Sequence, residues 1–192
     1  MRYAKDHKER SRQRLVESSG RVAKQRGFAS SGIDAMAAAS GVTSGSLYKH
    51  FSGKSELFAA IVQTELGRSA EVFSGDSLDT MGFEKALAAY LSLQHVHHPD
   101  RGCALPSLTA EVARSDKSVR AAFQKGLLAI HGAVTRSLKS DEQAWALIAQ
   151  SVGAVMLARA VLDDDVRNDL LLAAKKNGQA LLSRNPRRRV LR

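Results

Sequence analysis

The feature that most constrains the fold is the helical spacing of alanine and leucine, which continues through most of the 192 residues. Only three prolines interrupt the chain, and proline is the residue that helix interiors tolerate least. Hydrophobic residues make up 44% of the chain and charged residues 25%, as in globular proteins, so that a packed core can form. We therefore predict an all-α protein of about nine helices.

Positive charge is concentrated at the two ends of the chain. Residues 1–54 contain eleven Lys or Arg against four Asp or Glu, whereas residues 55–183 contain thirteen against fifteen. The remaining nine residues add five arginines. A basic N-terminal part on a nearly neutral body indicates a module that binds a polyanion, although a merely solvated basic face has the same composition. The predicted domains are 1–54, 55–184 and a basic tail over 185–192.

The cellular compartment is predicted from the lack of a signal peptide, of a disulfide and of a membrane span in the sequence. The charged start of the chain lacks the apolar run of a signal peptide, and Cys103, the single cysteine, cannot form an intramolecular disulfide. Polar residues interrupt the apolar stretch over 144–162, which favours a buried or interface helix over a membrane span. We expect a cytoplasmic protein without a membrane partner.

Glycines and small polar residues mark the predicted N-terminal helices. Gly27 ends the first helix and Gly41 forms a tight corner, both with left-handed backbone. Ser31, paired with Asp34 as a capping box, and Thr43 cap the next two helices. The predicted helices run over about 8–26, 32–39 and 43–50, and a longer fourth helix follows the cap residue Ser52.

The faces of these helices are predicted from the same spacing. Leu47 and Phe51 point into the core, whereas Ser44, Ser46 and Tyr48 point outward. On the first helix the basic side chains Arg12, Arg14, Arg21 and Lys24 are placed mostly on the surface. Later helices are predicted over about 80–97, 103–114, 117–138, 141–162 and 164–184, with Ser140 and Asp163 as caps.

Two short helices joined by a glycine corner within a basic segment are typical of a helix-turn-helix. The second helix of that motif enters the major groove of DNA, which is about 12 Å wide. The outward residues Ser44, Gly45 and Ser46 are small enough to let the helix approach base edges. The run SSGIDAMAAASGVTSGSLYKHFSGKSELF, residues 30–58, resembles the signature of the tetracycline-repressor (TetR) family of regulators.

The resemblance implies a DNA-binding domain of three helices and a helical C-terminal domain for ligand binding and dimerisation. It also implies that Thr43, Ser44, Gly45, Ser46 and Lys49 lie at or near bases. The residues that it implies at phosphates are Tyr48, His50, Lys54 and Ser31. Two alternatives stay open, a packing role for Tyr48 and a helix-capping role for His50.

The C-terminal part is predicted to respond to a small, mainly apolar molecule. We expect a homodimer that represses transcription at a palindromic operator. The effector is expected to move the fourth helix and so to release the dimer from the operator. The proposed ligand residues, assigned from helix position, are Tyr90, Gln94, His97, Cys103, Leu108, Phe123 and Trp145. The proposed dimer residues, on the apolar helix over 141–162, are Gly153, Ala154, Leu157 and Ala158.

Other functions have weaker support in the sequence. His95, His97, His98 and Cys103 could hold a metal, but Pro99 and Gly102 leave their geometry open, so no metal or cofactor is assigned. Cys103 could be a redox sensor or a half-buried structural thiol. An enzyme is disfavoured because the nucleophile elbow, the paired-histidine zinc helix and the dinucleotide glycine fingerprint are missing. A constitutive DNA-binding protein or an activator stays open.

Overall fold

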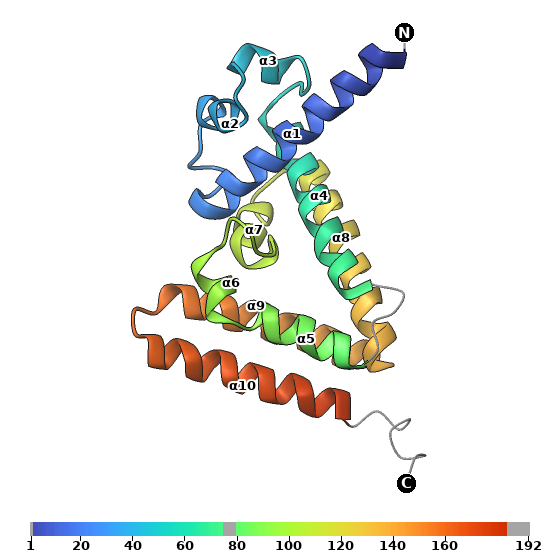
Figure 1. The fold of residues 1–192 in the computed structure, drawn as a ribbon, viewed down its shortest axis with the longest axis vertical. Helices are drawn as coiled ribbons and strands as arrows, with labels where there is room; N and C mark the ends of the chain where they lie inside the picture. Colours follow the sequence, from blue (N-terminus) through green and yellow to red (C-terminus); the bar gives the residue numbers. More distant parts are fainter. Residues whose placement is uncertain (1, 75–79, 184–192) are drawn as a thin grey trace. The chain divides into compact units, whose positions relative to one another are not determined.

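The computed structural model describes residues 2–74 and 80–183, which form ten helices and no strands (Figure 1). The prediction of an all-α fold is confirmed. The helices are α1 (Arg2–Arg26), α2 (Ile33–Ala39), α3 (Ser44–Tyr48), α4 (Lys54–Ser74), α5 (Thr80–Tyr90), α6 (Leu93–His97), α7 (Leu105–Val112), α8 (Lys117–Leu138), α9 (Asp141–Ala160) and α10 (Asp164–Ser183).

The described residues separate into two compact units. Of these residues, unit 1 is formed from 2–66 and 99–126, and unit 2 from 67–74, 80–98 and 127–183. The long helices α4 and α8 each contribute to both units. The domain boundary predicted after residue 54 therefore stays a prediction, and the predicted tail lies outside the described residues.

Unit 1 packs α1 against α2 and α7, and α2 against α3. Its core contains the predicted inward residues Leu47 and Phe51, both fully buried. The ring of Phe28 stacks on that of Phe58, with centroids 4.0 Å apart and planes 7° apart. Gly27, whose φ of +84° confirms its predicted left-handed backbone, turns the chain so that Phe28 reaches this position.

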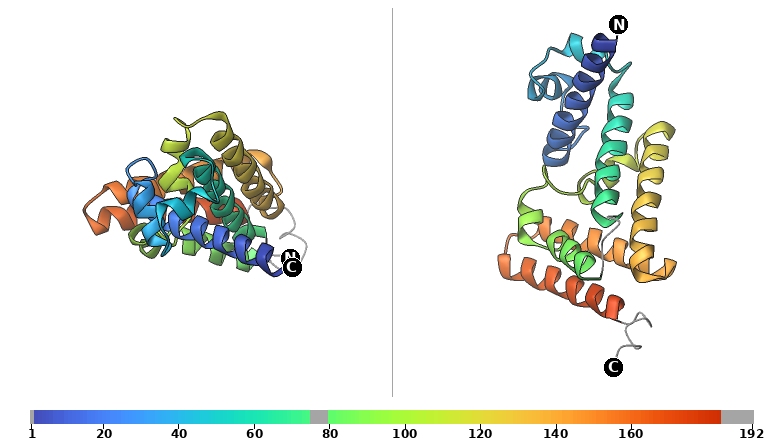
Figure 2. Two further views of the ribbon diagram at one scale, coloured as in Figure 1. Left: turned by 90° about the horizontal axis from the view of Figure 1, so that it is seen from above. Right: turned by 45° about the vertical axis from the view of Figure 1, so that its right-hand side comes forward.

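Unit 2 packs α10 along α9, which lie side by side in the ribbon views (Figure 2). α5 contacts α10 and α6, and α6 also contacts α9. The predicted interface helix α9 buries Ala144, Leu147 and Val155 within this unit. None of the described helices combines the length and the apolar character needed to cross a membrane.

The prediction of one helix over 80–97 is wrong, because the chain breaks after Tyr90. Ser92 adopts an extended backbone, with φ −134° and ψ 153°. Its hydroxyl accepts a hydrogen bond from the backbone N–H of His95 and so caps α6. Serine stabilises a helix start through its hydroxyl, and it disfavours a continuous helix. The break at Ser92 therefore gives ten helices in the described residues instead of the predicted nine.

Three predicted caps are confirmed and two are wrong. Thr43, Ser140 and Asp163 accept hydrogen bonds from the backbone N–H groups of their helices. Gly32 rather than Ser31 precedes α2, and no side chain caps that helix. Ser52 does not accept from α4. Instead its N–H and hydroxyl both donate to the Glu56 carboxylate at 2.7 Å, which lowers the pKa of Glu56.

The packing of α4 against α8 at Leu66 depends on the absence of a side chain at Gly126. A Cβ atom added there would lie 2.5 Å from the Cβ of Leu66, whereas one added at Gly67 would meet nothing within 4 Å. Gly126→Ala should therefore lower the free energy of unfolding by about 1–3 kcal/mol through overpacking. Gly67→Ala should raise it by about 0.5–1 kcal/mol through helix propensity. Urea denaturation measures both, and two changes of equal sign would contradict this packing.

Candidate nucleic-acid interface

The corner between α2 and α3 has the geometry of a helix-turn-helix. Gly41 has a φ of +70°, which confirms the predicted left-handed corner. The N–H of Val42 donates to the carbonyl of Ala37 at 3.1 Å and closes the turn. Thr43 then begins α3 in extended conformation, and its hydroxyl accepts from the N–H of Ser46 at 3.3 Å. The corner is exposed, so α3 is available to a partner.

The predicted DNA contacts differ in exposure. Leu47 faces the core from the middle of α3, which leaves the other side of this helix to solvent. Tyr48 is 54% exposed, which is compatible with a DNA contact and leaves the alternative packing role open. Ser31 is buried, and its hydroxyl donates to the carbonyl of Gly27 at 2.7 Å. The exposed positions are Thr43, Gly45, Tyr48 and Lys49, and the half-buried ones are Ser44, Ser46, His50 and Lys54.

Asp34 lies beside the predicted contact residue Ser44, although it was not predicted as a site residue from the sequence. It lies exposed in the first turn of α2, and its carboxylate accepts a hydrogen bond from the hydroxyl of Ser44 on α3. The capping box predicted between Ser31 and Asp34 is wrong, because no side chain caps α2 and the Ser31 hydroxyl donates to the carbonyl of Gly27. The pairing with Ser44 depends on how the two helices cross, and no local pattern indicates it.

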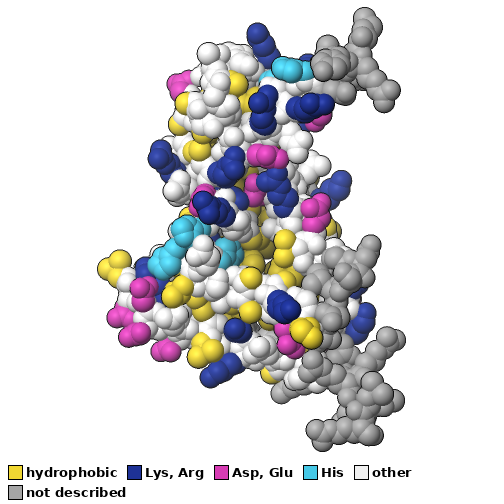
Figure 3. Space-filling model, in the orientation of Figure 1, with side chains coloured by type: hydrophobic (Ala, Val, Ile, Leu, Met, Phe, Trp, Pro, Cys, Tyr) yellow, Lys and Arg dark blue, Asp and Glu magenta, His cyan; other side chains and the backbone are white. Residues whose placement is uncertain are grey.

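Two cations of α1, Lys8 and Arg12, lie near the predicted contact residue His50 and were not among the residues predicted from the sequence. Partial burial, with added repulsion from Lys8 and Arg12, holds the pKa of His50 below its ordinary value. The Nδ1 atom of His50 is buried and has no hydrogen-bond partner among the described residues. The Arg12 guanidinium lies 4.8 Å from the centroid of the Phe51 ring. Figure 3 shows Lys and Arg side chains gathered over α1 on the face in view.

Lys54 is held beside the turn between α1 and α2. Its ammonium group donates to the carbonyl of Ala29 at 3.1 Å and lies 5.1 Å from the centroid of the Phe28 ring. Such contacts orient a lysine without neutralising its charge. Lys54 is therefore a fixed positive charge on the same unit as α3.

Lys24 was predicted on the surface of α1, but the structure buries it in unit 1. Its ammonium group lies 2.6 Å from a carboxylate oxygen of Glu65 and 2.8 Å from the carbonyl of Gly102. The side chains of Lys24 and Glu65 are only 4% and 6% exposed. Buried lysines are rare unless they are paired, so the sequence pattern, which counts charged residues as exposed, could not place this one.

Glu111 of α7 makes a second polar link to the N-terminal helices. Its two carboxylate oxygens accept hydrogen bonds from the backbone N–H groups of Phe28 and Ala29, at 2.9 and 2.5 Å. These N–H groups belong to the turn between α1 and α2. The turn that precedes the helix-turn-helix is thus held by a residue about 80 positions further along the chain.

Three predicted ligand residues lie in unit 1. Leu108 is buried in the core and Phe123 is half-buried. Cys103 is half-buried, and its sulfur accepts from the N–H of Leu105 at 3.4 Å.

The other four predicted ligand residues lie in unit 2. The Tyr90 ring packs edge-on against His95, with centroids 4.6 Å apart. Trp145 stacks on His131, with centroids 4.0 Å apart. Gln94 and His97 are exposed.

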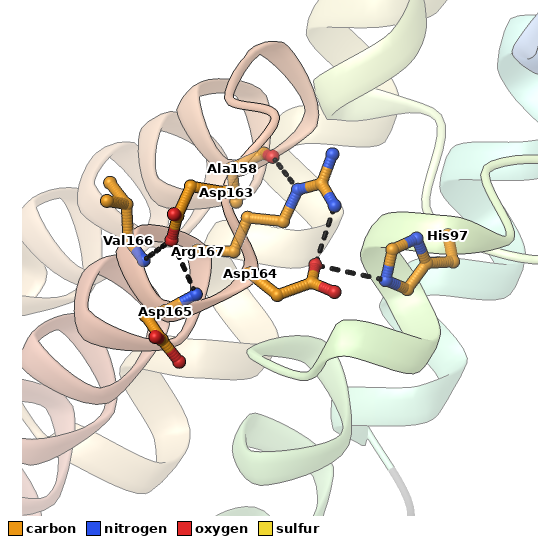
Figure 4. Close-up of polar contacts among 7 residues, drawn as sticks. All are labelled: His97, Ala158, Asp163, Asp164, Asp165, Val166 and Arg167. Carbon is orange, nitrogen blue, oxygen red and sulfur yellow. Dashed lines mark hydrogen bonds and ion pairs between the residues drawn. The ribbon is translucent and has the colours of Figure 1, made fainter.

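His97 lies beside the start of α10, where the chain turns from α9 into α10 (Figure 4). Its Nε2 atom lies 3.9 Å from a carboxylate oxygen of Asp164, which also accepts from Arg167 at 2.6 Å. Arg167 in turn donates to the carbonyl of Ala158 at 3.1 Å. Within the described residues, no group of three or more His, Cys, Asp or Glu is arranged to hold a metal ion.

The predicted dimer residues of α9 fall into two pairs. Ala154 and Ala158 are buried against their own chain, so they do not supply a surface to a partner. Leu157 is 57% exposed, and a Cβ atom added at Gly153 would meet nothing within 4 Å. Of these four residues, Leu157 and Gly153 are therefore the accessible ones.

Comparison with known proteins supports the helix-turn-helix. Residues 15–61 match the family model described as bacterial regulatory proteins, tetR family. The fold is similar to that of E. coli NemR in its reduced form, with 21% identity over 88% of this chain and 95% of that one, and a TM-score of 0.70. TetR-family regulators from Cytophaga hutchinsonii and Chloroflexus aurantiacus are each 19% identical with TM-scores of 0.72, covering 92% and 94% of this chain and 95% and 98% of theirs. No curated protein matches the sequence.

Proposed function

We propose that the chain is a DNA-binding transcriptional regulator of the TetR type, which represses transcription as a homodimer on a palindromic operator and is released by a small molecule. The observation that carries the proposal is the exposed helix α3 with cations of α1 and α4 on the same unit. Such a helix is suited to the major groove, while the cations are suited to phosphates.

Homodimerisation is supported by the exposed apolar side chains of α9 and α10. Met156 and Leu157 on α9 are 41% and 57% exposed, and Leu172 on α10 is 48% exposed. Large apolar residues on neighbouring helices are suited to a two-fold contact with a second copy. Two copies would then present two α3 helices to half-sites about 34 Å apart.

A response to a small molecule is supported by the aromatic content of unit 2. The centroid of the Phe73 ring lies 5.6 Å from that of Phe83 and 6.4 Å from that of Tyr90. Aromatic residues of this kind are suited to an apolar ligand. An effector that changes operator affinity 5- to 150-fold would supply about 1–3 kcal/mol of coupling.

The function is tested by selecting duplexes from a random-sequence pool with the purified protein at low salt. We expect enrichment of a palindrome with two half-sites. Light scattering should then give two protomers per palindrome or a multiple of two. Retention of no duplex would contradict the proposed function, and enrichment of single half-sites would contradict the dimer.

Lys54→Ala tests the phosphate contact. The lysine is held near the α1–α2 turn by Ala29 and Phe28, so its loss should weaken binding to every duplex to a similar extent. The slope of log affinity against log salt should fall by about one unit. Fluorescence anisotropy at several salt concentrations measures this slope, and Lys176→Ala, an exposed lysine of α10, is the control. An unchanged slope would remove Lys54 from the phosphate contacts.

A further inference from the structure

We infer that Asp34 and Ser44 together select a cytosine at one position of each operator half-site, an inference that rests on the proposed function. The two residues come from different helices, α2 and α3, and are joined by the hydrogen bond that the Ser44 hydroxyl donates to the Asp34 carboxylate. Asp34 is exposed although it is paired. A carboxylate at the exposed side of a helix-turn-helix faces a partner that is itself strongly negative, so it lowers affinity unless it meets a hydrogen-bond donor.

The hydrogen bond decides which groups the pair can recognise. Because the hydroxyl proton of Ser44 is directed to Asp34, the oxygen of Ser44 has only acceptor capacity left for another molecule. An ionised carboxylate also has only acceptors, and it keeps further lone pairs after accepting one bond. Asp34 and Ser44 therefore form a surface of acceptors without donors.

The four bases differ in how they meet such a surface in the major groove. Cytosine presents the N4 amino group as a donor, whereas guanine presents the acceptors N7 and O6 and thymine presents O4. Adenine offers a donor at N6 beside an acceptor at N7, which the carboxylate repels. The pair is thus complementary to cytosine and opposed to guanine.

The surroundings of the pair leave room for a base edge. Gly32, Gly41 and Gly45 are exposed. An added Cβ atom would meet nothing within 4 Å at Gly32 or Gly41, and only the Thr43 hydroxyl at 3.9 Å at Gly45. Small residues next to an oriented acceptor pair allow the backbone of α2 and α3 to come close to DNA.

The test is a selection from a random-sequence duplex pool with the wild-type chain and Asp34→Asn, followed by affinity measurements at one salt concentration. For the wild-type chain, replacing the selected cytosine with guanine should weaken binding roughly 5- to 150-fold. Asp34→Asn should move the preference at that position to adenine, because an amide offers a donor and an acceptor to N7 and N6. The same variant should bind unrelated duplexes more tightly, since it removes a negative charge.

Ser44→Ala is an independent second variant, and Ser55→Ala is its matched control. Ser44→Ala frees Asp34 from the partner that orients it and should reduce the ratio of cytosine to guanine affinity. Ser55 donates to Asp116 in a second exposed serine–aspartate pair of unit 1 that lies outside α2 and α3, so its loss should leave the ratio unchanged. A purely structural Asp34–Ser44 bond would change the thermal midpoint of Ser44→Ala and leave its base preference as in the wild-type chain.

Besides an unchanged base preference in Ser44→Ala, two results would overturn the inference alone. One is a selective operator without a cytosine-dependent position, and the other is a cytosine preference that Asp34→Asn leaves intact. Failure to retain any duplex would instead overturn the proposed function and this inference with it.

Discussion

Replacing Lys24 with methionine is expected to lower the free energy of unfolding by about 3–5 kcal/mol, the cost of removing one partner of a buried ion pair. The ammonium group of Lys24 is buried with the Glu65 carboxylate 2.6 Å away and the Gly102 carbonyl 2.8 Å away. Methionine fills similar space but removes the ammonium group that lies 2.6 Å from the buried carboxylate of Glu65. A Cβ atom added at Gly20 would lie 3.0 Å from that carboxylate, so the Glu65 side chain packs closely against α1.

Urea denaturation at a fixed protomer concentration measures this loss, because the stability of a dimer depends on concentration. Arg21→Met is the matched control, since Arg21 is exposed on the same helix and its replacement should change stability by no more than about 0.5 kcal/mol. The double variant Lys24→Met/Glu65→Leu should recover most of the loss because it leaves no buried charge. A single variant as stable as Arg21→Met would show that the pair contributes nothing.

Replacing Leu157 with glutamate is expected to convert the proposed dimer to monomers and to weaken operator binding by roughly 10²-fold or more, the size of the avidity gained by linking two sites. The side chain of Leu157 is 57% exposed on α9, so glutamate is compatible with the folded subunit. In a two-fold contact the new carboxylate would be buried next to its own copy, which is costly for an unpaired charge.

Sedimentation equilibrium and operator titration measure the two effects. Leu128→Glu is the matched control, because Leu128 is 50% exposed on α8, outside the proposed interface, and should leave both properties unchanged. Gly153→Glu should reproduce the effect of Leu157→Glu, since its side chain meets nothing within 4 Å in its own subunit. An intact Leu157→Glu dimer would place the interface elsewhere.

Local sequence signals predicted much of the helix-turn-helix. The left-handed backbone at Gly27 and Gly41 and the cap at Thr43 follow from the conformational freedom of glycine and from hydroxyl acceptors at helix starts. Leu47 and Phe51 were placed in the core by helical spacing alone. These features succeed because each depends on residues within one or two helical turns.

The errors have a common origin in contacts between distant segments. Lys24 was predicted on the surface because it is charged, and its partner Glu65 is 41 positions away. Ser31 and Asp34 were paired with each other because their spacing resembles a capping box, whereas their hydrogen bonds go to Gly27 and Ser44. The break at Ser92 was missed because alanine and leucine spacing continues across it.

The amino-acid sequence by itself determined the all-helical class and the basic helix-turn-helix, since spacing, glycine corners and composition are local properties of the chain. Only the tertiary structure decided which polar groups are buried, which small residues of α9 are already covered, and that Asp34 points its carboxylate at Ser44. The physical reason is that burial and hydrogen-bond partners depend on where helices cross, and a crossing joins residues that no sequence window contains together.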